Sequence, residues 1–127
     1  MDNTAMAFSD TEEFKRCTCC GQVWPAREDF LSDDNILLNG YQANFKDPAR
    51  GLFLFVHLKK ECGTSVAIRS ENFRDLYDGP VYLGSLRGSE ECPGYCLGQF
   101  DLNRCDARCR NAYVRELLHI IGRWPKK

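Results

Sequence analysis

Hydrophobic residues fall in short runs along most of this chain, which is a pattern typical of short strands. The run Leu52–Leu58 has the length and aromatic content of a strand, and Val66–Ile68 is the next strand candidate. Asn39-Gly40 is a favoured two-residue turn, which predicts a hairpin between Ile36–Leu38 and Tyr41–Phe45. The first half of the chain is therefore predicted to consist of antiparallel hairpins.

Helical patterns are fewer. Pro25–Leu31 is a candidate short helix with proline in its first turn. Ser70–Tyr77 is a second, with Ser70 as its N-cap. The strongest pattern covers Asp106–Ile121, where apolar residues recur on one broad face before Gly122. Val81–Leu83 is a weak strand candidate between these helices.

Composition places the chain among ordinary globular proteins, with 43% hydrophobic and 28% charged residues in 127. No apolar run approaches the roughly 20 residues of a membrane span. The formal net charge of −1 argues against a general polyanion binder. Residues 92–127 are nevertheless basic, with seven Lys or Arg against three Asp or Glu.

Cysteine is the outlier, with eight residues. The first ten residues lack the basic and apolar regions of a secretion signal, so we expect a cytoplasmic location. Reducing conditions there disfavour stable disulfides and favour thiolate–metal sites.

The first cysteine cluster has the form of a zinc knuckle. In Cys17-x-x-Cys20-Gly21, two thiolates lie three residues apart in a turn that glycine relaxes. A second half is offered by His57 and by Cys62, which is again followed by glycine, at the tip of a predicted hairpin.

Over residues 14–69 this arrangement resembles a zinc ribbon or a rubredoxin-like knuckle. The resemblance implies a tetrahedral zinc site of Cys17, Cys20, His57 and Cys62. Two alternatives remain: His57 is a half-exposed histidine at a strand end, or Cys19 takes its place as fourth ligand. Outside the site, Cys19 is a spare thiol and a candidate redox residue.

The second cluster is a symmetric quartet with two spacings of three residues around one of eight. Its members are Cys92, Cys96, Cys105 and Cys109. Cysteines at i and i+4 share one face of a helix, so two helical segments can bring four thiolates to one ion. Zinc is the first expectation here, which gives two zinc ions in all.

Two other chemistries fit the same quartet. Four thiolates also hold a 4Fe–4S cluster. An antiparallel helical hairpin with this spacing resembles the twin Cys-x3-Cys hairpins of oxidising compartments, which would bridge Cys92 to Cys109 and Cys96 to Cys105.

The predicted fold class is α+β. A flexible acidic arm (1–13) precedes a zinc-ribbon-like hairpin unit (14–80) and a helical unit with the four-cysteine motif (81–127), the last two packed as one domain. The whole chain resembles small cysteine-rich bacterial proteins. No nucleophile elbow, phosphate loop or His-Glu-x-x-His motif is present, and both quartets are closed, which favours structural zinc over catalysis.

The expected function is that of a cytoplasmic protein-interaction or regulatory module whose partner is another protein. A basic stripe on the last helix is a candidate partner surface; it comprises Arg104, Arg108, Arg115 and His119. The stripe has two readings, the solvated face of an amphipathic helix or a binding site for phosphate or acidic groups. The other candidate classes are a nucleic-acid-binding zinc protein and an iron–sulfur or thiol redox protein.

Overall fold

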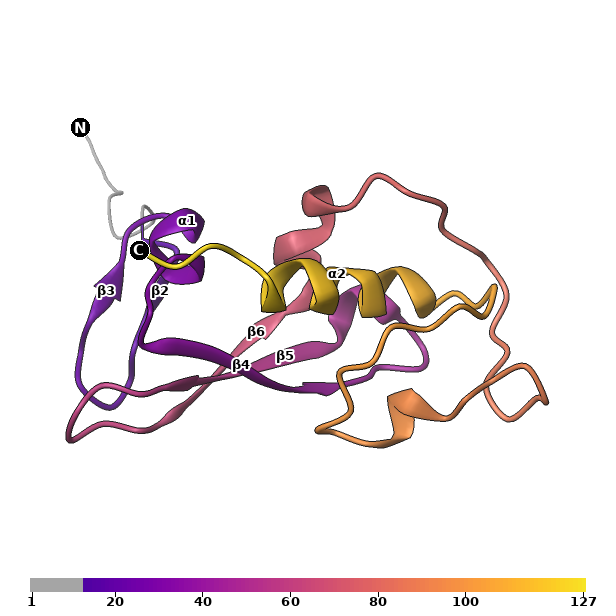
Figure 1. The fold of residues 1–127 in the computed structure, drawn as a ribbon, viewed down its shortest axis with the longest axis horizontal. Helices are drawn as coiled ribbons and strands as arrows, with labels where there is room; N and C mark the ends of the chain where they lie inside the picture. The colour runs from indigo at the N-terminus through magenta and orange to yellow at the C-terminus, as the bar shows by residue number, and fades with distance from the viewer. Residues whose placement is uncertain (1–12) are drawn as a thin grey trace.

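The computed structural model describes residues 13–127, and all of the predicted arm except Glu13 lies outside them. Its centre is an antiparallel three-stranded sheet with the strand order β4 (Ile36–Gln42), β5 (Leu52–His57), β6 (Ser65–Arg69). Figure 1 shows this sheet running along the molecule, with helix α2 (Ala112–Gly122) lying beside it in roughly the same direction. The fold is mixed α/β with small antiparallel sheets.

A second, smaller unit lies at one end of the sheet. It is a two-stranded ribbon of β2 (Lys15–Arg16) and β3 (Val23–Trp24), followed by helix α1 (Arg27–Leu31). The side chain of Asp29 accepts a hydrogen bond from the backbone N–H of Ala26, which stabilises the start of α1. This helix lies within the segment predicted as helical.

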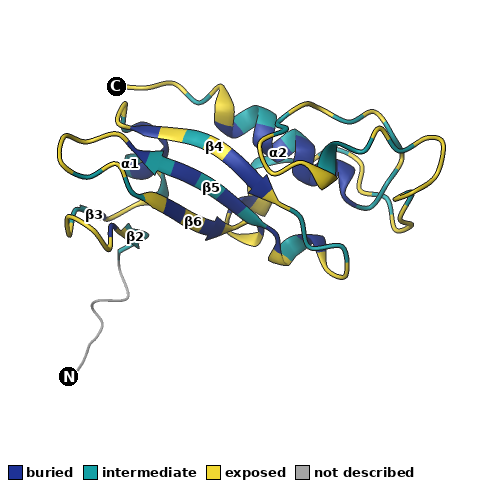
Figure 2. Cartoon of the chain, turned by 90° about the horizontal axis from the view of Figure 1, so that it is seen from below, coloured by how far each residue is buried: buried dark blue, intermediate teal, exposed yellow. Residues whose placement is uncertain are grey.

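Strand β5 alternates as a half-buried strand should. Phe53, Phe55 and His57 are buried, whereas the residues between them are partly exposed (Figure 2). The partner strand β6 buries Val66 and Ile68 on the same face, opposite Phe55 and Phe53. The alternation therefore places a histidine at the end of a row of core aromatics.

The predicted turn at Asn39-Gly40 is wrong: both residues lie inside β4. The pairing register shifts between Leu38 and Gly40, so Asn39 is the extra residue of a β-bulge. The reason for glycine is a close approach, because a Cβ on Gly40 would lie 2.9 Å from the carbonyl oxygen of Gln99. The bulge changes the alternation so that Tyr41 faces the core.

The main core lies between the sheet and the helical elements that cover it. Helix α2 supplies buried Val114, Leu117 and Leu118, and the 3₁₀ helix Ser70–Leu76 supplies Phe73. The 3₁₀ helix confirms a helical segment after Ser70. The Ser70 hydroxyl, however, donates to the Pro48 carbonyl oxygen 2.8 Å away rather than capping the helix.

Helix α2 is shorter than predicted, because it begins at Ala112 instead of Asp106. Polar residues precede Ala112, and the backbone N–H of Arg110 donates to the Gly84 carbonyl oxygen, outside any helix. Between Leu76 and Ala112 the only regular element is the 3₁₀ helix Tyr95–Leu97, so the predicted Val81–Leu83 strand is absent. In the described part of the chain, no helix is long and apolar enough to cross a membrane.

Candidate metal centre

The β2–β3 loop is held by its own backbone. The N–H of Cys17 donates to the Gln22 carbonyl oxygen at 2.8 Å, and the N–H of Gly21 donates back to the Cys17 carbonyl oxygen at 2.9 Å. Gly21 has a φ of +79°, in the left-handed region that glycine enters without strain. The loop therefore holds Cys17 and Cys20 on one short turn.

The β5–β6 loop makes the second half. The N–H of His57 donates to the Thr64 carbonyl oxygen, and the N–H of Cys62 donates to that of Lys59, both at 2.9 Å. The turn from Lys59 to Thr64 has a positive φ at Glu61 and at Gly63. A side chain at φ 68° is strained, and such strain is found where the surrounding structure requires the conformation.

The two loops bring four ligand atoms together, at the lower left of Figure 1. The Sγ atoms of Cys17 and Cys62 are 3.6 Å apart. His57 Nδ1 lies 3.5 Å from Cys62 Sγ and 3.8 Å from Cys20 Sγ. All four atoms lie within 4.8 Å of one another, so the cluster can hold a metal ion.

Burial separates the inner ligands from the outer ones. His57 is 0% and Cys17 is 1% exposed, whereas Cys62 is half-buried and Cys20 is exposed. The His57 ring packs edge-on against the Trp24 ring at a centroid distance of 5.0 Å. The alternative of a half-exposed histidine at a strand end is therefore wrong.

The local environment favours the thiolate form of Cys17. Burial raises the pKa of Cys17, but hydrogen bonds from the backbone at Cys20 and Cys19 and from the side chains of His57 and Cys62 outweigh it, and the pKa falls to about 6. Such a thiol is mostly ionised at neutral pH, which is the form that binds metal.

The neighbouring thiols behave in the opposite way. The Gln22 backbone lowers the pKa of Cys20 and the Thr64 backbone lowers that of Cys62, but burial and Cys17 together raise both. Ionisation of one thiol thus disfavours ionisation of the next, and a bound cation removes this repulsion between the thiolates.

Asp33 stabilises the surroundings of the centre through Trp24 and Gln22, and the sequence did not point to it. Its Oδ2 accepts hydrogen bonds from Trp24 Nε1 at 2.9 Å and from Gln22 Nε2 at 3.2 Å. Burial raises the pKa of Asp33, but these bonds and one from the Asn35 backbone lower it overall. Asp33 therefore fixes the indole that packs on His57; no spacing in the sequence signals this role.

The second quartet does not form a comparable cluster. Within residues 13–127 only the first quartet has three or more ligand atoms within 4.8 Å of one another. Cys105 and Cys109 lie outside α2, and Cys96 lies in a 3₁₀ turn, so the two predicted helical segments are wrong. The four cysteines nevertheless line one small cavity.

The predicted basic stripe is not a continuous surface. Arg115 is fully buried, and Arg104 forms an ion pair with Glu116 at 2.8 Å. Arg108 is exposed and His119 is half-buried. Helix α2 was predicted to turn Arg115 toward solvent, but the irregular chain before it covers this side of the helix.

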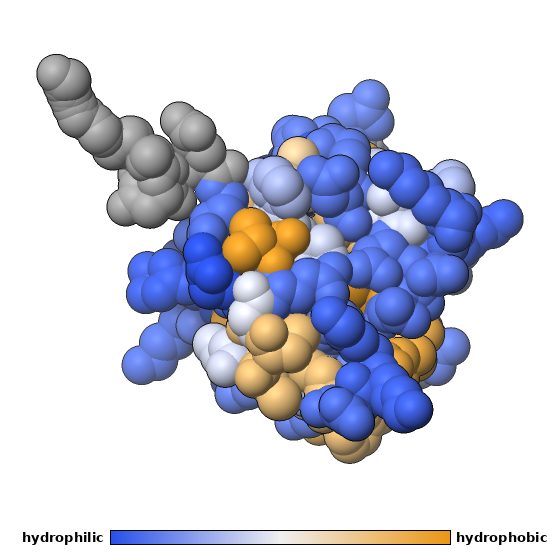
Figure 3. All heavy atoms as spheres, turned by 90° about the vertical axis from the view of Figure 1, so that its left-hand side faces the viewer, coloured by the Kyte–Doolittle hydropathy of each residue, from blue (hydrophilic) through white to orange (hydrophobic). Residues whose placement is uncertain are grey.

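Cys19 lies outside the cluster and is exposed. Figure 3 shows the end of the molecule that carries the two loops: hydrophilic residues cover most of it, and hydrophobic ones form small patches.

Comparison with protein-family models, curated proteins and solved structures finds no match for the chain. The chemistry of the centre therefore follows from its own geometry.

Proposed function

We propose that Cys17, Cys20, His57 and Cys62 hold one structural Zn²⁺ that fastens the two hairpin loops together. The observation that carries this proposal is the spacing of the ligand atoms. Zn–S bonds of about 2.3 Å and a Zn–N bond of about 2.05 Å give tetrahedral edges of about 3.8 Å between sulfurs and about 3.6 Å between sulfur and nitrogen. The contacts of 3.5 to 3.8 Å among these atoms agree with such edges.

The donor set also favours zinc. Three thiolates and one imidazole are soft and borderline ligands, which suit Zn²⁺ better than Mg²⁺ or Ca²⁺. Four protein ligands fill a tetrahedron and leave no position for substrate, so the role is structural. The arrangement of two facing loops is also the basis of the zinc-ribbon resemblance, which we retain as part of the proposal.

The experiment is metal analysis of the full chain purified without oxygen. We expect zinc in the wild type, loss of one equivalent in Cys17→Ser, and no loss in Cys19→Ser. The second variant is the matched control, because Cys19 is a neighbouring cysteine outside the cluster. Zinc retained in Cys17→Ser would overturn the site, and iron in its place would overturn the choice of metal.

The wider role that we propose is a zinc-stabilised module that binds another protein. Support comes from apolar side chains left in solvent along the irregular segment, where Leu83 is 92%, Leu97 73% and Phe100 68% exposed. The nucleic-acid alternative has less support, because in the predicted basic stripe Arg115 is buried and Arg104 is paired with Glu116.

The interaction role is tested by comparing the wild type with Leu97→Ser/Phe100→Ser. Proteins captured from cell extract are quantified for both, together with the zinc content of each bait. We expect a defined protein to be lost with the variant while its zinc content is unchanged. The same captured set for both baits would contradict this role.

A further inference from the structure

A buried arginine lies at the second group of cysteines. The cavity there has a volume of about 20 Å³, and it is lined by Arg115 together with all four cysteines of the quartet: Cys92, Cys96, Cys105 and Cys109. Each of the four is half-buried. Four thiols, one from a 3₁₀ turn and three from irregular chain, thus line one small space.

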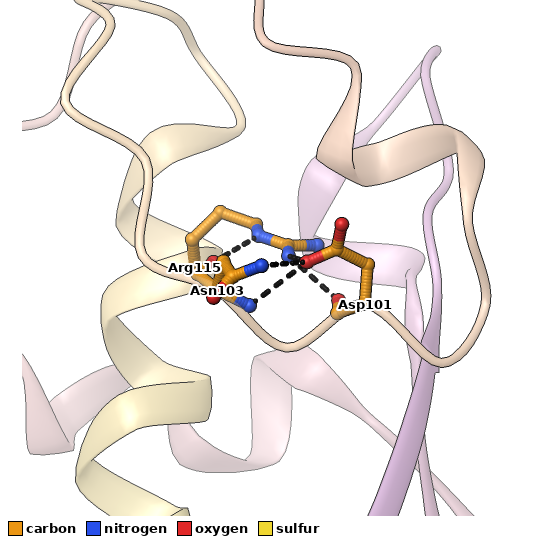
Figure 4. Close-up of polar contacts among 3 residues, drawn as sticks. All are labelled: Asp101, Asn103 and Arg115. Carbon is orange, nitrogen blue, oxygen red and sulfur yellow. Dashed lines mark hydrogen bonds and ion pairs between the residues drawn. The ribbon is translucent and has the colours of Figure 1, made fainter.

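The guanidinium of Arg115 is held rigidly on one side only. Its Nε donates to the Asn103 carbonyl oxygen at 2.9 Å, and its Nη2 donates to the Asp101 carbonyl oxygen at 2.6 Å and to the Asp101 carboxylate at 3.2 Å (Figure 4). Nη1 is also buried, but it has no hydrogen-bond partner among the described residues. One end of a fully buried cation therefore has unused donors.

Burying a charge this deeply costs several kcal/mol unless opposite charge compensates it. The carboxylate in contact with Arg115 belongs to Asp101, which is 30% exposed and also accepts bonds from the backbone and side chain of Asn103. The rings of Tyr41 and Tyr95, each 5.6 Å from the guanidinium carbon, add favourable quadrupoles but no charge. Further negative charge close to Nη1 would complete the compensation.

The cysteines can supply that charge. Cys96 lines the cavity together with Arg115, the buried cation whose Nη1 lacks a partner within the described chain. Cys109 Sγ accepts a bond from the backbone N–H of Leu86 at 3.2 Å. Backbone N–H groups and a guanidinium both donate hydrogen bonds to metal-bound thiolates, so the cavity already contains donors for sulfurs that bind a metal ion.

We propose that Cys92, Cys96, Cys105 and Cys109 bind a second metal ion as four thiolates, and that the buried guanidinium of Arg115 is the counter-charge of this site. Four thiolates around a divalent ion carry a net charge of −2, which one arginine halves. The inference does not depend on the first centre, because the two sites share no ligand.

The size of the cavity favours a single ion. A volume of about 20 Å³ accommodates roughly one water-sized particle, whereas a 4Fe–4S cluster contains eight atoms. The sulfurs must draw inward to bind, because they do not lie as close together as those of the first centre. They can do so without breaking a strand or an α-helix, since the chain that carries them is irregular apart from one 3₁₀ turn.

The first test is the mass of the folded wild-type chain by native mass spectrometry, which requires no variant. We expect a species with two zinc ions. Cys96→Ser should retain one, Cys17→Ser should retain one, and Cys19→Ser should retain both. A wild type with one zinc, lost in Cys17→Ser and kept in Cys96→Ser, would overturn this inference and leave the first centre intact.

Two further outcomes would also overturn it. Iron with acid-labile sulfide would mean a cluster in place of a single ion. Alkylation of the unfolded, unreduced chain at only four of its eight cysteines would mean disulfides, which the same spacing also allows.

The role of Arg115 is tested separately by competition with a chromophoric zinc chelator. Arg115→Met should weaken the second site by roughly tenfold to a hundredfold, the value of a hydrogen bond to a charged group. Asp101→Asn is the matched control: it loosens the loop contact but keeps the arginine, so zinc affinity should stay within about threefold. Equal weakening in both variants would reduce Arg115 to a support for the loop and overturn its role as counter-charge.

Discussion

The two ligand quartets, one of three cysteines and a histidine and one of four cysteines, differ in how the chain builds them. The first lies on two hairpin loops whose backbone hydrogen bonds fix each turn, and its ligand atoms already lie within 4.8 Å of one another. The second is drawn from irregular chain around a cavity, beside a buried arginine. The quartet with the more regular spacing in sequence is the less assembled in space.

The difference shows that strand register assembles a site more tightly than regular spacing does. Cys17 and Cys20 are separated from His57 by more than 35 residues, but paired strands define where each loop lies. In the second quartet, the spacing predicts two helical segments, but Gly94 and Gly98 disfavour the first of them.

Complete removal of metal should have the largest effect. A structural zinc contributes on the order of 10 kcal/mol in peptide models, which is comparable with the total stability of a typical domain. We therefore expect chelation to unfold the β2–β3 and β5–β6 loops and to lower the melting temperature sharply. Circular dichroism and hydrogen exchange measure this; an unchanged melting curve after full demetallation would contradict it.

The next prediction compares single ligands of the two quartets. Cys62→Ser should expose backbone amides of β5 and β6 to hydrogen exchange, because the loop joining these strands carries the ligand. Cys105→Ser should increase exchange only in residues 77–111. The measurement is exchange followed by peptide mass spectrometry, and the same pattern in both variants would remove the distinction between the quartets.

The sequence allowed the first centre to be predicted because its signals are local. Each cysteine–glycine pair marks a turn, and the alternation of Phe53, Phe55 and His57 could also have predicted that the histidine is buried. The error at Asn39-Gly40 has a tertiary cause. The dipeptide suits a turn, but Gly40 is required by the approach of Gln99, which no local pattern reveals.

The exposure of Arg115 on helix α2 was predicted wrongly for a similar reason. Arg115 lies on the polar side of an amphipathic pattern, and such residues are usually solvated. Here the loop with Asp101 and Asn103 covers it and supplies carbonyl oxygens as acceptors. Irregular chain has no periodicity, so its packing on α2 could not be predicted.

The contact between strand β4 and the irregular segment that carries the second quartet allows a prediction of a smaller effect. The backbone N–H of Tyr41 donates to the Gln99 carbonyl oxygen at 2.7 Å, and Gly40 allows this approach. Gly40→Ala should cost about 1–3 kcal/mol, the usual range for overpacking. Urea unfolding measures the cost. Asn39→Ala at the exposed bulge residue is the control and should cost much less; equal costs would contradict the close-contact argument.

The smallest effect at neutral pH is expected for Tyr41→Phe. The Tyr41 hydroxyl is buried and unpartnered in the described structure, so its removal should change stability by less than about 0.5 kcal/mol at pH 7.

Alkaline pH should separate Tyr41→Phe from the wild type. Burial raises the pKa of Tyr41 well above its usual value of 10.0, so the stability of the folded state is complete below pH 10 and falls as the unfolded tyrosine ionises above it. At pH 11 the wild type should have lost about 1.4 kcal/mol more than Tyr41→Phe. Urea midpoints at pH 7 and pH 11 provide the comparison, and parallel losses would refute it.

The bulge in β4 has a consequence for self-association. Both β4 and β6 are edge strands, and edges with free N–H and C=O groups can recruit another chain into an intermolecular sheet. On β4, the bulge at Asn39 interrupts the row of free backbone N–H and C=O groups, and the Tyr41 N–H already donates to the Gln99 carbonyl oxygen. On β6, the Ala67 carbonyl oxygen accepts a hydrogen bond from Lys15 Nζ at 3.2 Å. The sheet is thereby protected along both margins against the strand-by-strand growth that leads to aggregates.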